Sequence, residues 1–277
     1  MAIRDINASD VYAVLSKVEA RSKETARRIR QRIEAVFNRA IAIGSAQSNP
    51  GAQVKGAMAP MKKGKQPAIT DLDQAREMLA KAEAEPAHPL TKLALRILAL
   101  TAVRPGTLAG TPWDEWTDLD SEAPVWRIPA ERMKMRLKHK SDEARDHLVP
   151  LPLQAIEAIE ALRTISGRGP LAFPNTRHAH KPMSENAMGY LLNRAGYHGH
   201  HVPHGWRSTF SSVMNERFPS DKYIIDLMLA HTPKDKVEAA YNRALHLERR
   251  RELAQEWADI ILKDAKPAAS LLEGPRR

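Results

Sequence analysis

The chain has 277 residues, a length that suits two domains, and its 43 Lys and Arg exceed its 33 Asp and Glu to give a formal net charge of +10. Hydrophobic residues make up 43% and aromatic residues only 5%, which favours helices packed through aliphatic side chains over an aromatic-rich β-sandwich. The absence of cysteine excludes disulfides, thiolate zinc sites and cysteine nucleophiles, while the basic charge leaves a polyanion binder and an ordinary basic protein equally open.

The N-terminal sequence MAIRDINASD lacks the apolar centre of a signal peptide. The longest apolar run, 93–103, is interrupted by Arg96 and is too short to cross a bilayer. We therefore expect a soluble, cytoplasmic protein that does not contact a membrane.

The first predicted element is a helical hairpin over 9–44, with Ser9 or Asp10 as the first cap and Gly44 as the C-terminal stop. Apolar residues recur at helical spacing in its second helix. The other face is basic and either faces solvent or lies along phosphates; it carries Arg21, Lys23, Arg27, Arg28, Arg30 and Arg32.

The stretch 45–68 is rich in Gly, Pro, Ser and Lys and has the composition of a linker. Thr70 and Asp73 resemble a capping box for a helix over 71–84. Pro89 suits the first turn of the next helix, which we expect to run to about Val103.

Short apolar runs at 125–128 and 147–149 predict an antiparallel hairpin with a long basic tip. Trp113, Trp116 and Trp126 are expected to be packing residues. Further helices are predicted at 153–166, 184–195, 204–218, 220–230, 233–244 and 246–263, and disorder at 265–277. The last helix carries an apolar stripe that either enters the core or docks on a partner: Leu247, Leu253, Trp257, Ile260 and Ile261. The predicted fold is mainly α with a small antiparallel β-sheet.

Two arginines, two histidines and a tyrosine occur at spacings that are candidates for a functional site. His204 and Arg207 are three apart at the start of a predicted helix and share one face. His231 follows Arg207 by 24 residues and Tyr241 follows His231 by ten. Arg104 ends a predicted buried helix.

The ordered set "TAVRPGTL", "HGWR", "LAH" and "AAYNRA" resembles the tyrosine recombinase family, and more narrowly the prophage and genomic-island integrases. "WRIPAERMKMR", "HLVPLP", "FPN", "KPMSENAM" and "ERRRELAQEWAD" are similar to the same subgroup. The resemblance runs through most of 8–263. A lone H-x-x-R would have no specificity, whereas the ordered set is specific.

The resemblance implies a site-specific recombinase that cuts and rejoins DNA strands through a covalent 3′-phosphotyrosyl intermediate. It implies a partial helical core-binding domain at 1–58, a linker at 59–68 and a recombinase catalytic domain at 69–264. Tyr241 would be the nucleophile. The implied catalytic set is Arg104, Lys134, His204, Arg207, His231 and Tyr241.

These residue types suit the chemistry independently of the resemblance. Two guanidiniums stabilise the charge on non-bridging phosphate oxygens with fixed donors, so no metal or cofactor is expected. A tyrosine with a pKa near ~10 must lose its proton as it attacks, and a histidine can accept that proton. Lys134 on the hairpin can protonate the departing 5′ oxygen.

The resemblance further implies double-stranded DNA with an attachment site as substrate, a homotetramer on that DNA, and a directionality factor as another partner. It places the chain in a prophage or other mobile genetic element. It begins near residue 5, where such integrases usually carry more preceding sequence, so we expect a shortened N-terminal part that is mobile without DNA and binds it weakly.

Two features depart from the family pattern. Thr107 stands three positions after Arg104, where the family usually has an acidic residue, so a carboxylate partner for that arginine is lost. The stretch after Lys134 is longer than usual, which makes Lys138 and Lys140 rival proton donors.

Other interpretations remain open at this point. Taken alone, Tyr241 is a surface residue, Arg104 a helix cap and His231 a core or capping residue. A DNA-relaxing topoisomerase would use the same chemistry, and a truncated or decayed integrase relative would bind DNA without cutting it. His198, His200 and His201 have no implied role; a solvated or DNA-facing loop is favoured over zinc binding or a metal sensor.

Overall fold

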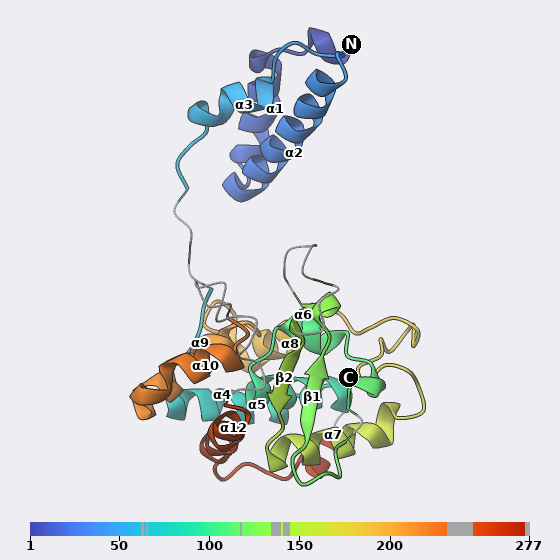
Figure 1. Cartoon of the computed structure of the whole chain (residues 1–277), viewed down its shortest axis with the longest axis vertical. Coiled ribbons are helices and arrows are strands. Elements are labelled where there is room, and N and C mark those ends of the chain that lie inside the picture. Colours follow the sequence, from blue (N-terminus) through green and yellow to red (C-terminus); the bar gives the residue numbers. More distant parts are fainter. Residues whose placement is uncertain are drawn as a thin grey trace. The chain divides into compact units, whose positions relative to one another are not determined.

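The computed structural model describes residues 1–61, 64, 66–116, 118–133, 140, 145–231 and 246–274. The chain divides into two compact units, Met1–Lys65 and Gln66–Arg277 (Figure 1). Within the residues that are described, no helix is both long and apolar enough to span a bilayer.

The smaller unit confirms the helical hairpin, as α1 (Ala8–Glu19) and α2 (Lys23–Ala42). The first cap is Asn7 rather than Ser9 or Asp10. Its Oδ1 accepts from the amides of Ser9 and Asp10 at 2.8 and 3.1 Å, and the Asp10 carboxylate accepts from the Asn7 amide. Gly44 follows α2 with φ +75°, the left-handed conformation that ends many helices.

Part of the segment with linker composition is folded. The helix α3 (Pro50–Gln53) and the 3-10 turn Val54–Ala57 pack against α1, and α3 also packs against α2, because Val54 and Met58 join the apolar cluster of the hairpin. Arg30, expected on the basic outer face, is instead buried. Its guanidinium donates to the Gly51 carbonyl at 2.9 Å and to Glu34 at 2.6 Å, which ties α2 to α3.

The larger unit is mainly helical, with one two-stranded sheet among its described residues. The predicted 233–244 helix lies outside those residues. The described helices and strands are α4 (Leu72–Ala84), α5 (Pro89–Thr101), α6 (Pro105–Ala109), β1 (Val125–Ile128), β2 (His147–Pro150), α7 (Leu153–Ser166), α8 (Asn186–Leu192), α9 (Gly205–Arg217), α10 (Lys222–Met228) and α12 (Leu247–Ile261). A π-helical turn, Asn193–Tyr197, and short 3-10 turns at Trp113–Glu115, Ala130–Arg132, Pro219–Asp221 and Ala268–Leu272 complete it.

Several predicted helix boundaries shift by a few residues, and two of the shifts have a clear local cause. The cap of α4 is Asp71, whose carboxylate accepts from the Gln74 amide at 2.9 Å, so the Thr70–Asp73 capping box is wrong. Pro89 does occupy the first turn of α5. That helix ends at Thr101, because Ala102 adopts a left-handed conformation with φ 48°.

The core of the larger unit is built around α5, which is buried along nearly its whole length and packs against α7, α8 and α12 (Figure 1). Leu253, Trp257 and Ile261 of α12 are buried there, and the Trp257 indole donates to the Ala99 carbonyl at 2.8 Å. Three of the five residues of the predicted stripe therefore form a core face of their own unit, while Leu247 and Ile260 are only partly buried.

The predicted hairpin is confirmed, with Trp126 of β1 opposite Val149 of β2. Trp126 is fully buried and packs edge-to-face on Trp116 at 5.4 Å, which in turn contacts Trp113 at 5.4 Å. These tryptophans are packing residues, as predicted. Most of the hairpin tip, including Lys134 and Lys138, lies outside the described residues.

The expectation of disorder from residue 265 is wrong for 265–274. Ala268 and Leu271 are buried between α5 and α7, and the Ala268 amide donates to Glu157 at 2.7 Å. The buried Arg96 guanidinium also donates to the Lys266 carbonyl at 2.7 Å. Pro267 and Gly274 flank a 3-10 turn that packs on the core. One face of this turn is buried because its two apolar side chains, three residues apart, lie on the same side.

Candidate active site

Arg207 occupies the first turn of α9 and is buried. Its guanidinium donates to the carbonyl of Ala102 at 2.8 Å and to that of Leu229 at 2.5 Å. Those carbonyls stand at the C-terminal ends of α5 and α10, where a helix has acceptors without an intrahelical partner and the backbone dipole favours a cation. The two bonds fix the plane and position of the guanidinium.

Arg104 stands close to Arg207. It precedes Pro105, which forces it out of helical geometry (φ −71°, ψ 135°) and makes it the residue before α6. Burial lowers the pKa of Arg104; burial and the charge of Arg104 lower the pKa of Arg207 to about 10. No carboxylate pairs with either guanidinium within the described part of the chain, so the two cations present an uncompensated site for an anion.

His231 completes a contiguous group with these arginines. Its Nε2 lies 3.3 Å from Arg207 Nη2, and its Nδ1 lies 3.0 Å from Asp226 Oδ1. A carboxylate on Nδ1 fixes the tautomer with the proton on that nitrogen, which leaves Nε2 as an acceptor beside Arg207. The turn before His231 is tight, since Ala230 is left-handed (φ 49°) and the His231 backbone amide donates to the Asp226 backbone carbonyl. Nothing in the sequence pattern singled out Asp226.

The remaining predicted site residues are either exposed or outside the described part of the chain. His204 is exposed immediately before α9, one helical turn ahead of Arg207. Lys134 and Tyr241 lie outside the described residues, as does Lys138. The structure thus brings Arg104, Arg207 and His231 together.

Thr107, the departure from the family pattern, is buried and tied to the hairpin base. Its carbonyl accepts from Arg132 Nη2 at 2.5 Å. Arg132 also pairs with Glu115, whose carboxylate accepts from the Trp126 indole at 2.8 Å. This arginine therefore connects α6, which follows Arg104, to the strand that leads toward Lys134. Arg132 lies two positions before Lys134, and the resemblance implied a role only for that lysine.

The histidine tract divides in two. His198 and His200 are exposed, as expected of a solvated loop, but His201 is fully buried, which corrects the prediction for that residue. Its Nδ1 accepts from the Ile69 amide at 3.1 Å and its ring packs edge-to-face on Trp206 at 5.1 Å. Among the residues described, no group of three potential metal ligands gathers there or elsewhere.

Burial lowers the pKa of His201 to about 4, and this predicts a pH dependence of stability. Between about pH 6.5 and 4 the unfolded chain binds a proton at this residue while the folded chain does not, so stability falls as the pH falls through this window. The loss over the window is about 3.5 kcal/mol, from ~1.4 kcal/mol per pKa unit. Denaturant unfolding across this range should show a shallower loss in His201→Asn than in wild type or in His200→Asn. Equal slopes in all three would contradict the assignment.

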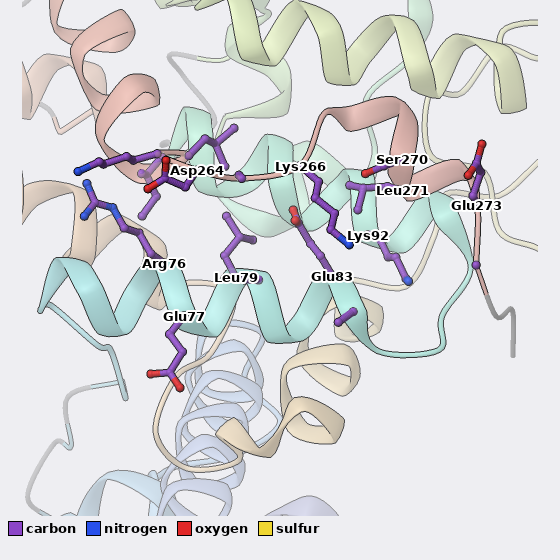
Figure 2. Close-up of a pocket in the computed structure, with 17 residues that line it drawn as sticks. Arg76, Glu77, Leu79, Glu83, Lys92, Asp264, Lys266, Ser270, Leu271 and Glu273 are labelled. Carbon is purple, nitrogen blue, oxygen red and sulfur yellow. The ribbon is translucent and has the colours of Figure 1, made fainter.

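A separate pocket of about 780 Å³ lies between α4, α5 and residues 261–274. Figure 2 shows Glu83, Lys92 and Lys266 among its lining side chains. Glu83 is held by Arg96 through bonds of 2.7 and 2.5 Å, and burial lowers the pKa of Lys92. The pocket contains neither arginine of the candidate site, so it is a different part of the unit.

Comparison with known proteins agrees with this architecture. Residues 1–57 match the phage integrase central domain and residues 69–248 match the phage integrase family. The chain is 34% identical over 263 residues to prophage integrase IntA of Escherichia coli (strain K12), covering 94% of this chain and 60% of that protein. It is 36% identical over 262 residues to prophage integrase IntZ of the same strain, covering 94% and 61%. The integrase of Enterobacteria phage P4 is 31% identical over 278 residues, covering 98% and 62%.

Solved structures share the fold. A lambda integrase (75–356) dimer bound to a COC′ core site aligns with a TM-score of 0.58 at 19% identity, covering 91% of this chain and 81% of that one. The Tn1549 transposon integrase (82–397) in complex with circular intermediate DNA aligns with a TM-score of 0.57 at 14% identity, covering 91% and 86%. The chain spans about three-fifths of the length of the curated relatives described above. Because its smaller unit matches the phage integrase central domain and its larger unit matches the phage integrase family, the chain belongs to the phage integrase family.

Proposed function

We propose that the chain is a site-specific DNA recombinase that cuts and rejoins DNA strands through a covalent 3′-phosphotyrosyl intermediate. The observation that carries this proposal is the pair of adjacent guanidiniums, Arg104 and Arg207, without a carboxylate partner in the described structure and beside a histidine oriented by Asp226. Membership of the phage integrase family supports the same activity.

The two arginines would bind the non-bridging oxygens of one phosphodiester. Guanidiniums remain charged at neutral pH even when burial lowers the pKa of Arg207 to about 10. Because Arg207 is already anchored to two helix ends, little reorganisation is needed as negative charge develops on the non-bridging phosphate oxygens.

The bond changes follow from the residue types. The Tyr241 oxygen attacks phosphorus, a P–O bond to tyrosine forms, and the bond to the 5′ oxygen breaks. The tyrosyl proton passes to a histidine of the site, His231 or His204, and Lys134 donates a proton to the departing oxygen. The reverse reaction with another 5′ hydroxyl rejoins the strand, so no nucleotide cofactor is needed.

The substrate is double-stranded DNA that carries an attachment site. Lambda integrase is known as a dimer on a core site and as a tetramer bound to a Holliday junction, which supports a homotetramer on DNA here. Residues 1–58 would form the core-binding part and 69–264 the catalytic part, joined by 59–68. A directionality factor would set the balance of integration and excision. Phosphate contacts from a chain of charge +10 would make binding salt-dependent.

The test is a covalent trapping experiment. The protein is incubated with attachment-site DNA, taken from the direct repeats that flank its gene, nicked beside the scissile phosphate. An adduct that survives SDS is expected with this DNA and not with a scrambled duplex. Adducts on both, with relaxation of a plasmid that lacks the site, would indicate a topoisomerase instead. A footprint without an adduct would indicate a DNA-binding relative that no longer cuts.

Lys134→Ala is expected to slow cleavage of a normal 5′ oxygen by on the order of 10²-fold, the usual contribution of a general acid. A substrate with a bridging 5′ sulfur should restore the rate, because sulfur leaves without a proton. Lys138→Ala and Lys140→Ala serve as matched controls on the same hairpin and should cleave both substrates normally. Sulfur rescue confined to one of those two variants would move the role along the hairpin.

A further inference from the structure

The segment that enters the larger unit, residues 67–69, is seated on the start of α9. The Val202 amide donates to the Pro67 carbonyl at 3.3 Å, and the Ile69 amide donates to His201 Nδ1 at 3.1 Å. From within α9, the Thr209 hydroxyl donates to the Ile69 carbonyl at 2.6 Å. Three hydrogen bonds thus join this short stretch, which overlaps the end of 59–68, to the turn and helix that carry His204 and Arg207.

Gly205 shows how closely the two segments approach. A Cβ at this position would lie 2.8 Å from the Pro67 carbonyl oxygen and 3.0 Å from the His201 ring. The approach to the carbonyl oxygen is closer than a real Cβ atom comes, the approach to the ring is tighter than most Cβ contacts, and the carbonyl belongs to backbone that cannot easily move aside. The glycine of the "HGWR" sequence is therefore required by this junction.

His201 is the centre of the junction. It is fully buried, and only an unprotonated Nδ1 can accept the hydrogen bond from Ile69, so its proton resides on Nε2. Trp206 packs on the ring, and Gly205 lies against its other nitrogen. Losing the acceptor would leave the Ile69 amide unpaired at this point and release the 67–69 segment from α9.

We propose that His201 is a positioning residue, which seats the 67–69 segment on the start of α9 and thereby fixes where Arg207 and His204 stand. This inference rests on the proposed function only where the test measures adduct formation, since the other two measurements need no activity. Misplacing a catalytic group by about an ångström costs on the order of 10²-fold in rate, so the junction should affect the chemical step more than DNA affinity.

The test compares His201→Leu, which removes the acceptor, with His201→Asn, whose amide oxygen can replace Nδ1. His200→Leu is the matched control, because the neighbouring ring is exposed. Three quantities are measured on the full chain: amide exchange at Ile69, the NMR shift of the Arg207 Nε–H, and the single-turnover rate of adduct formation at saturating DNA.

His201→Leu should lose protection at Ile69, shift the Arg207 signal and slow adduct formation by on the order of tenfold to a hundredfold. Its DNA affinity should stay within about threefold, since phosphate contacts dominate binding. His201→Asn should restore the protection and most of the rate, and His200→Leu should behave as wild type. An unchanged Arg207 signal in His201→Leu would overturn the proposal, as would a normal rate with Ile69 unprotected.

Thr209→Val provides a milder variant should His201→Leu fail to fold, because it deletes only the hydroxyl, which donates to the carbonyls of Ile69 and Gly205. It should move the same three quantities in the same direction. If wild type forms no adduct, the proposed recombinase activity fails, yet the Arg207 signal still decides whether His201 positions that side chain.

Discussion

Replacing Tyr241 by phenylalanine should abolish the covalent protein–DNA adduct while leaving DNA binding within about threefold, because phosphate contacts elsewhere supply most of the affinity. The single atom removed is the proposed nucleophile, and no other hydroxyl can substitute for it in a site built around one phosphate. The rate should therefore fall to background. Trapping on a nicked attachment site, followed by SDS gel electrophoresis, measures the effect.

The matched control for this variant is Tyr190→Phe, since Tyr190 is exposed on α8 and lies in no proposed contact with the site. It should form the adduct at the wild-type rate. Mass spectrometry of the trapped product should place the nucleotide on the peptide that contains Tyr241. An adduct in Tyr241→Phe, or a nucleotide on another peptide, would show that this tyrosine is not the nucleophile.

Much of the fold follows from local signals in the sequence. Period-3.6 apolar spacing located α2, an apolar stripe marked α12, and Pro89 indicated the start of α5. These signals could not predict which of several neighbouring polar residues caps a helix. Asn7 and Asp71 are the caps because the backbone geometry at each helix start decides which side chain reaches the free amides.

Composition was a weaker guide than periodicity. The segments 49–58 and 265–274 read as a linker and a tail because they are rich in Pro, Gly and small residues, yet each docks through two apolar side chains: Val54 with Met58, and Ala268 with Leu271. A short segment needs only such a pair when a neighbouring surface is already formed. That surface is a tertiary feature which a local sequence pattern does not contain.

In the candidate site, too, some residues could be predicted from the sequence and others could not, because they depend on tertiary contacts. Arg104, Arg207 and His231 were predicted from their order in the sequence and its resemblance to the tyrosine recombinases, and guanidinium and imidazole chemistry suits the roles that the resemblance implies. Arg132 and His201 were missed because each contacts a residue distant in sequence, Thr107 and Ile69 respectively. Asp226 lies only five positions before His231, but no sequence pattern marked its carboxylate as a partner of that ring. His201 is the sharpest case: burial depends on where Ile69 lies, 132 positions away.

Replacing Arg207 by lysine should slow adduct formation by on the order of 10³-fold, the cost of removing one preorganised donor to a developing oxyanion. A lysine keeps the positive charge but has no planar fork, so it cannot bind a phosphate oxygen while donating to both Ala102 and Leu229. One helix-end carbonyl would lose its partner, which should lower the free energy of unfolding by about 1–3 kcal/mol.

Arg217→Lys is the matched control, because that arginine lies exposed at the far end of the same helix. It should retain wild-type cleavage and stability. The two effects in Arg207→Lys are separable: single-turnover rates at saturating DNA, well below the unfolding temperature, report the chemistry, and denaturant unfolding reports the anchoring. A cleavage rate within about threefold of wild type together with reduced stability would assign Arg207 to holding α5 and α10 together, since phosphate stabilisation would then have to come from elsewhere.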